Sequence, residues 1–156
     1  MVAPLFAIAE AEHRSGRDLL VAFMVGVEVQ HRIGRGVNFH HYTKGWHPTA
    51  TLGIFGTTAA AAHLLRLDRQ QVAVALAIAA SFAAGIKANF GTMTKPLHVG
   101  HTARSGLLAA LVAEDLLLHP LLRLHLGHLF EGRGPGGLDP KGAPLPLARR
   151  AVPDGR

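Results

Sequence analysis

The sequence contains no cysteine among its 156 residues. This absence excludes disulfide frameworks, thiol nucleophiles, iron–sulfur clusters and zinc sites built from cysteine. Charged residues are also scarce, at 17%, whereas apolar residues make up 49% of the chain. A chain of this length and composition can fold around one real core but is too short for two ordinary domains.

Long runs of large apolar residues are missing as well. The two longest uncharged stretches, Gly45–Leu65 and Gln70–Ile86, consist mainly of small residues, which is typical of buried helices rather than membrane spans. Met1–Ala11 lacks the basic start of a signal peptide and runs directly into Glu12, His13 and Arg14. We therefore expect a soluble cytoplasmic protein that does not associate with membranes.

Alternating strand patterns are absent, and the periodicity up to Asp115 predicts an all-α fold, an antiparallel helix bundle. Capping pairs and prolines mark the expected helix starts. The first predicted helix begins after Ser15 and fades near Gly34 or Gly36, and the second runs from Pro48 to Leu67. The third spans Val72–Ala84 after the Asp68 cap and is expected to be buried on most sides, and the last runs from Pro96 through Ala113. The segments Asn38–Trp46 and Lys87–Thr94 are expected to be loops.

The composition changes abruptly near residue 116. Residues 116–156 contain six of the nine prolines and seven of the eighteen glycines. The first part of this segment is rich in leucine and histidine, and no helical or strand period follows. We predict a domain at 1–115 and a divergent tail at 116–156, disordered from about residue 131.

Acidic residues are absent between Glu28 and Asp68 and again between Asp68 and Glu114. The chain carries a net charge of +6, with eleven histidines in addition. This balance favours anionic partners such as nucleic acid, a membrane surface, or small carboxylates and phosphates. The plainer alternative is that apolar helices simply carry few charges.

Two cationic residues precede prolines that can begin a helix, in His47-Pro48 and Lys95-Pro96. The first turn of a helix has unpaired N–H groups that attract carboxylates and phosphates. The same positive end is expected to lower the pKa of the preceding His or Lys toward a value that suits proton transfer. Both positions are therefore candidate anion sites with an acid or base.

Other polar clusters support weaker hypotheses. His98 and His101 share a helix face, and His40-His41 precede His47, but no carboxylate or thiolate lies nearby in the sequence. We therefore expect surface or hydrogen-bonded histidines and no metal site. The glycines match no nucleotide-binding spacing, and the serines lack a nucleophile elbow. An alternative function is a basic helical module that binds nucleic acid or another polyanion, with aromatic stacking groups in its loops: Phe39, Tyr42, Trp46 and Phe90.

Two segments resemble motifs of the MmgE/PrpD family. Gly45–Thr51 reads GWHPTAT and is followed by Gly53, Phe55 and Gly56, as in the family's histidine motif, and Phe90–Gly100 reads FGTMTKPLHVG, as in its lysine motif. The resemblance covers about residues 3–115. The family includes 2-methylcitrate dehydratase, cis-aconitate decarboxylase and iminodisuccinate epimerase.

The resemblance implies a largely helical domain, a homodimer, no required metal or cofactor, and acid/base chemistry on small polycarboxylates. It implies that His47 and Lys95 are catalytic and that Thr94 and His98 are substrate-binding candidates. Family members are several hundred residues long, with an upstream Asp/Thr/His segment and a downstream α/β domain that have no counterpart here. We therefore expect an inactive internal fragment whose reading frame is lost near residue 116; an unstable gene remnant is a further alternative.

Overall fold

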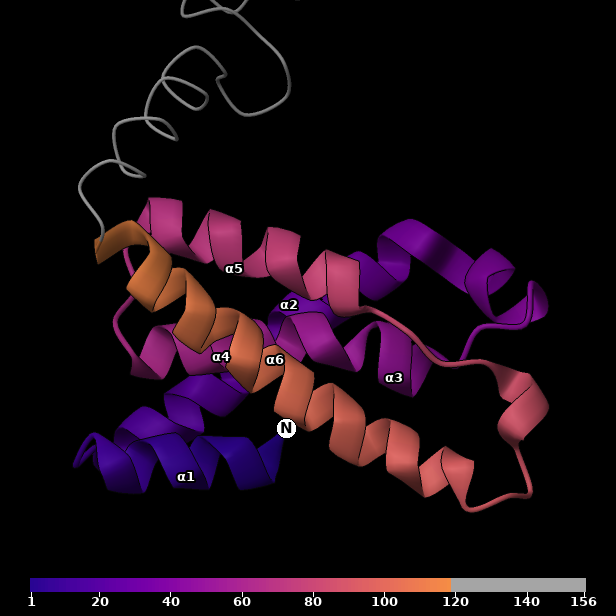
Figure 1. Cartoon of the computed structure of the whole chain (residues 1–156), viewed down its shortest axis with the longest axis horizontal. Helices are drawn as coiled ribbons and strands as arrows, with labels where there is room; N and C mark the ends of the chain where they lie inside the picture. Colours follow the sequence, from indigo (N-terminus) through magenta and orange to yellow (C-terminus); the bar gives the residue numbers. More distant parts are fainter. Residues whose placement is uncertain (119–156) are drawn as a thin grey trace, which may run out of the picture. The chain divides into compact units, whose positions relative to one another are not determined.

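The structure is a computed structural model that describes residues 1–118, drawn in colour in Figure 1. The disorder predicted from about residue 131 lies outside the described residues. The elements are α1 (Val2–Ala11), α2 (Gly16–Thr43), α3 (Pro48–Thr51), α4 (Gly53–Leu64), α5 (Arg69–Phe82), the 3-10 helix η1 (Lys87–Asn89) and α6 (Thr94–Leu118). Within residues 1–118 there is no β-strand, only an isolated bridge between Trp46 and Ile86, so the predicted all-α fold is confirmed.

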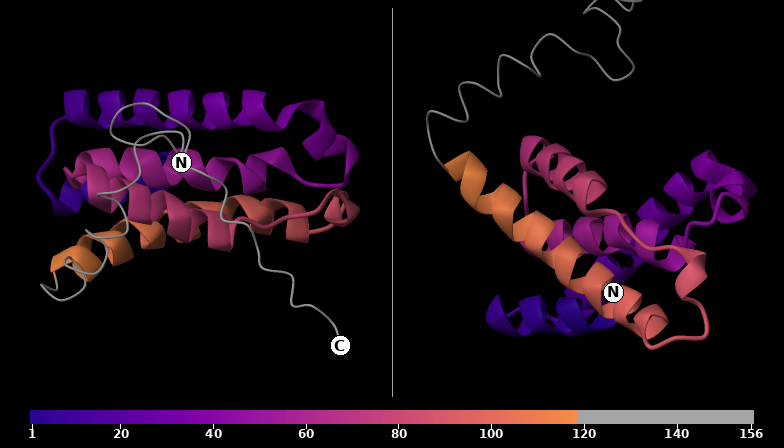
Figure 2. Two further views of the ribbon diagram at one scale, coloured as in Figure 1. Left: turned by 90° about the horizontal axis from the view of Figure 1, so that it is seen from above. Right: turned by 45° about the vertical axis from the view of Figure 1, so that its right-hand side comes forward.

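The helix α4 is the central element, and α1, α2 and α5 all pack against it. Figure 2 shows α2 running along the length of α4. The helix α6 crosses α4 closely enough for the Thr58 hydroxyl to donate a 3.1 Å hydrogen bond to the Gly106 carbonyl. No helix in residues 1–118 combines the length and the apolar character needed to cross a membrane.

The capping residues were predicted correctly. Ser15 with Asp18 and Asp68 with Gln71 both form reciprocal capping boxes, at the starts of α2 and α5. In each box, two side-chain oxygens accept hydrogen bonds from two backbone N–H groups that would otherwise lack a partner at the helix start. These caps explain why the chain turns into a helix at these two points.

The predicted end of the first long helix is wrong. Instead of fading near Gly34 or Gly36, α2 continues to Thr43, so the expected loop at Asn38–Trp46 is mostly helical. Packing of α2 against α3 and α4 outweighs the cost of about 1 kcal/mol per glycine in a helix. The helix ends at Gly45, whose φ of +97° allows the Gly45 and Trp46 N–H groups to donate back to Tyr42 and His41 carbonyls.

Two further expectations, one about a helix boundary and one about burial, differ from the structure. The helix expected from Pro48 to Leu67 is interrupted at Leu52 and forms α3 and α4. The helix expected at Val72–Ala84 is α5, and it buries only Ala75 and Ala79 rather than most of its sides. The element surrounded by others is α4, where ten of the twelve residues are buried.

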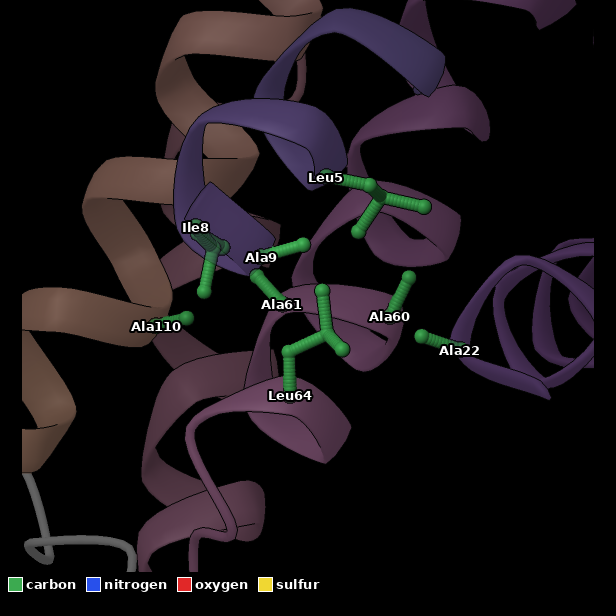
Figure 3. Close-up of a cluster of buried hydrophobic side chains, with 8 residues drawn as sticks. All are labelled: Leu5, Ile8, Ala9, Ala22, Ala60, Ala61, Leu64 and Ala110. Carbon is green, nitrogen blue, oxygen red and sulfur yellow. The ribbon is translucent and has the colours of Figure 1, made fainter. Parts of the chain in front are cut away.

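The core is built from small side chains, which lets the helix backbones approach closely. Figure 3 shows one cluster in which α1, α2, α4 and α6 meet: Leu5, Ile8, Ala9, Ala22, Ala60, Ala61, Leu64 and Ala110. A Cβ atom on Gly26 would lie 2.6 Å from the Gly56 carbonyl oxygen, so α2 and α4 touch through bare backbone. This tight packing fixes the first turn of α4, which follows His47 and α3 in the chain.

Candidate active site

His47 stands at the junction between the end of α2 and the start of α3. The side chain is only 5% exposed. Its backbone N–H donates a 3.0 Å hydrogen bond to the Gly85 carbonyl, which follows α5. Gly85 has a φ of +132°, and a Cβ there would lie 2.7 Å from the Cβ of Ala50. The chain can therefore pass this close to His47 only with glycine at position 85.

The imidazole of His47 meets a second imidazole from α6. Its Nδ1 lies 3.1 Å from Nδ1 of His98. The other ring nitrogen of His98, Nε2, lies 3.5 Å from the side-chain amide nitrogen of Asn89, at the end of η1. Both nitrogens of His98 are thus engaged by protein groups.

Phe90 joins His47 to Lys95. The rings of His47 and Phe90 meet edge to face, with centroids 4.8 Å apart and an interplanar angle of 81°. The Lys95 ammonium lies 4.5 Å from the centroid of the same Phe90 ring. A cation over an aromatic ring is held by the ring quadrupole, so Phe90 keeps the Lys95 charge close to His47.

Of the four predicted site residues, the structure brings His47, His98 and Lys95 together. Thr94 lies four residues before His98 and therefore on the same face of α6. Its backbone N–H donates to the Thr92 hydroxyl at 3.2 Å. The roles of the four residues stay predictions.

The pKa of His47 is lowered from its ordinary value of 6.5, first by burial and then by the charges of His98 and Lys95. The direction expected from the sequence is confirmed, but the expected cause is wrong. The helix that follows His47, α3, has only four residues, too few for a substantial macrodipole. The His47 ring is instead shielded from water and surrounded by like charge.

The expectation that Lys95 precedes a helix is also wrong. The helix α6 begins at Thr94, so Lys95 and Pro96 both lie within its first turn. A proline is tolerated there because the N–H groups of the first turn have no acceptor within the helix. Lys95 is therefore placed by the Phe90 ring and by the start of α6, not by an extended residue before it.

A second set of contacts holds the backbone of His47 from the opposite side. The buried Thr51 hydroxyl donates to the His47 carbonyl at 3.1 Å and lies 2.6 Å from Nε2 of His41. The His41 ring stacks on Trp46 with centroids 6.0 Å apart. The sequence analysis missed this positioning function of Thr51 and His41, although Thr51 ends the histidine motif and His41 precedes it.

Asn89, Phe90 and Gly85 were also missed as contributors to the site. Phe90 begins the lysine motif and the other two precede it, but only the fold shows that η1 returns to His47. Among residues 1–118, no three His, Asp or Glu side chains gather in a way that could hold a metal ion. His101 instead lies 3.4 Å from the Ser105 hydroxyl, the hydrogen-bonded arrangement expected for such a histidine.

Comparison with known proteins agrees with the two motifs. The model of the MmgE/PrpD N-terminal domain matches residues 1–116. Human cis-aconitate decarboxylase is 44% identical over 117 residues, which cover 70% of this chain and 24% of that protein. The mouse cis-aconitate decarboxylase is 41% identical over 111 residues, covering 69% of this chain and 22% of its own length.

A fungal relative extends the same pattern. The cis-aconitate decarboxylase of Aspergillus terreus is 37% identical over 101 residues, covering 64% of this chain and 21% of that protein. The chain thus spans about a quarter of the length of these relatives. Because the family's N-terminal domain matches from residue 1 to residue 116, the chain belongs to the MmgE/PrpD family.

Proposed function

We propose that this chain carries the histidine and lysine of an enzyme for lyase-type acid/base chemistry on small di- or tricarboxylates, with cis-aconitate as the first substrate to test. The observation that carries the proposal is the cluster of buried His47, half-buried His98 and exposed Lys95 around Phe90. The acid-free sequence on both sides of Asp68 adds support. The names of the relatives, all cis-aconitate decarboxylases, direct the choice of substrate.

Decarboxylation and dehydration of polycarboxylates both require the kinds of groups that this cluster contains. Loss of carbon dioxide from a tricarboxylate, like loss of water from a hydroxy acid, develops negative charge beside carboxylates that are already anionic. Fixed cations lower that barrier, and a proton carrier completes the reaction. In the proposal, Lys95 anchors a carboxylate and His47 binds or protonates the reacting region. Thr94 contributes its hydroxyl to carboxylate binding, and His98 contributes through its contact with His47.

The isolated chain is proposed to bind but not to turn over substrate, because it spans only about a quarter of its relatives. A homodimer is part of the proposal. It is supported by exposed apolar side chains on α2, where Leu20 is 63% and Met24 is 68% exposed, and sedimentation equilibrium tests it.

The cytoplasmic location expected from the sequence also belongs to the proposal, and imaging of the tagged chain in cells tests it.

Calorimetric titration of the purified chain with cis-aconitate and citrate tests the proposed site. Saturable binding that His47→Ala and Lys95→Ala each weaken tenfold or more would support it. Lys87→Ala is the matched control, because the Lys87 ammonium lies 3.7 Å from the centroid of the Tyr42 ring rather than over Phe90. Binding lost equally in all three variants would show a general charge effect.

Two results would contradict the proposal. One is no binding by a chain that unfolds cooperatively and is therefore folded. The other is tight binding of nucleic acid with a steep salt dependence and no preference for polycarboxylates, as expected when phosphate contacts release counterions. In parallel, release of carbon dioxide from cis-aconitate measures whether the chain alone has activity.

A further inference from the structure

A line of hydrogen bonds through the candidate site determines which nitrogen of His47 carries a proton. The nitrogen of the Asn89 side-chain amide has only donor hydrogens. Its 3.5 Å contact with Nε2 of His98 therefore requires that this nitrogen accept. A neutral imidazole has one N–H, so the proton of neutral His98 is on Nδ1.

The tautomer of His98 in turn constrains the ring of His47. Nδ1–H of His98 faces Nδ1 of His47 at 3.1 Å, and two protonated nitrogens cannot share that distance favourably. Nδ1 of His47 must therefore accept, which leaves the proton of neutral His47 on Nε2. We propose that Asn89 and His98 are positioning residues that hold neutral His47 as its Nε2–H form, so that it offers a hydrogen-bond donor to a bound carboxylate.

Within residues 1–118, no other hydrogen-bond partner competes for the ring nitrogens that connect Asn89, His98 and His47. The backbone of His47 is held separately, with its N–H on Gly85 and its carbonyl on Thr51. The rings of His47 and Phe90 meet edge to face, a contact between apolar ring surfaces and not a hydrogen bond to a ring nitrogen that the line uses. A Cβ on Gly85 would lie 3.6 Å from Nδ1 of His98, an ordinary van der Waals contact, so the turn at Gly85 lies directly beside the paired rings.

The charged groups that face His47 favour its neutral form. Lys95 and His98 approach from α6, and within residues 1–118 no carboxylate contributes to the shift of the His47 pKa. From α2, His41 reaches the His47 backbone only through Thr51. Burial and these neighbouring charges lower the pKa of His47 from 6.5, so neutral His47 is the relevant form above pH 6.5.

The alternative proton arrangement has the opposite chemical character. With the proton on Nδ1, His47 would present a bare Nε2, and its lone pair would face the lone pairs of a carboxylate oxygen. Such a ring could serve as a base but would not bind the anion. The inference deepens the proposed function and rests on it, since it assumes that His47 faces a carboxylate.

Long-range ¹H–¹⁵N NMR of the full 156-residue chain, with ¹⁵N-labelled histidine and no ligand, reads the protonated nitrogen of each ring directly. The His47 and His98 signals are assigned from the His47→Asn and His98→Asn spectra. When both rings are neutral we expect one tautomer for each, with the proton on Nε2 of His47 and on Nδ1 of His98. A proton on Nδ1 of His47 would overturn the proposal.

Variants of Asn89 test the cause of this pattern. In Asn89→Ala, both rings should lose their single tautomer. Asn89→Asp replaces the donor with an acceptor, so Nε2 of His98 should become protonated. The control Thr92→Val removes the 2.8 Å hydrogen bond from the Thr92 hydroxyl to the Asn89 carbonyl and should leave both tautomers unchanged. Unchanged tautomers in both Asn89 variants would show that this amide does not set them.

Ligand binding separates this inference from the proposed function. Calorimetry with citrate should give about tenfold weaker binding in Asn89→Ala, because the donor on His47 is no longer fixed. If the tautomers are as expected but no polycarboxylate binds, the proposed function fails and the positioning by Asn89 stands. If binding depends on His47 but its proton lies on Nδ1, the positioning fails and the proposed function stands.

Discussion

Nδ1 of His47 lies 3.1 Å from Nδ1 of His98, although 51 residues separate them in the chain. In a hydrogen bond at this distance one nitrogen donates and the other accepts, whereas protonation of both would place two N–H groups face to face. The pair therefore resists taking up a full charge on both rings, in addition to the effect of burial on His47. This relationship connects the electrostatics of the site to the stability of the fold.

The unfolding free energy should depend on pH through His47. Its pKa is lowered in the folded protein from 6.5, so below pH 6.5 the unfolded chain takes up a proton that folded His47 resists. The stabilisation is fully present above pH 6.5 and is lost as the pH falls toward the lowered pKa. Urea unfolding at several pH values measures this loss.

His47→Asn supplies the comparison for this measurement, because asparagine keeps a polar group near Nδ1 but does not titrate. The difference between the wild-type chain and this variant removes the contributions of the other histidines. His13→Asn is the matched control, since His13 is exposed. A wild-type stability that falls no more steeply below pH 6.5 than that of His47→Asn would contradict the prediction.

Phe90→Leu should weaken polycarboxylate binding without unfolding the chain. Leucine keeps an apolar side chain at this half-buried position but removes the ring face that holds the Lys95 ammonium. A cation–π contact at an exposed site contributes about 0.5–1 kcal/mol, which corresponds to roughly 2–5-fold in affinity. Calorimetry with citrate measures the change. Phe82→Leu is the control, because Phe82 lies on the exposed end of α5. Equally weakened citrate binding in both variants would contradict a specific role of the Phe90 ring.

The sequence allowed two site residues, His47 and Lys95, to be selected from charge and proline positions, and the family resemblance added His98 and Thr94. It could not show that Phe90 lies between them or that Asn89 contacts His98. Those contacts depend on how η1 and the start of α6 return to the end of α2. No local period or charge pattern encodes such a return, because it results from packing around α4.

The fold shows the same division between local and non-local information. The capping boxes at Ser15 and Asp68 are local and were predicted correctly. The end of α2 was not, because Gly34 and Gly36 are local helix breakers that tertiary contacts override. Gly45 ends the helix instead, and only its φ of +97° distinguishes it from the two earlier glycines.

Gly85→Ala should destabilise the chain and disturb the site together. The new Cβ would lie 2.7 Å from the Cβ of Ala50, and the φ of +132° is unfavourable for alanine. Strain of this kind costs on the order of 1–3 kcal/mol, measured by urea unfolding. The control Gly91→Ala has a φ of +85° but open space around its Cβ, so it reports the backbone cost alone. Equal destabilisation in the two variants would show that the contact with Ala50 is unimportant.

The close approach of α2 and α4 gives a prediction with a control in the same helix. Gly26→Ala would place a Cβ 2.6 Å from the Gly56 carbonyl oxygen and 2.9 Å from the Cβ of Ala60, so the two helices must separate. We expect a loss of about 1–3 kcal/mol in unfolding free energy, typical of an overfilled core. Gly36→Ala meets nothing within 4 Å and should instead gain about 0.5–1 kcal/mol from alanine's helix propensity. Urea unfolding followed by circular dichroism measures both, and a gain in Gly26→Ala similar to that in Gly36→Ala would mean that the helices are not in backbone contact.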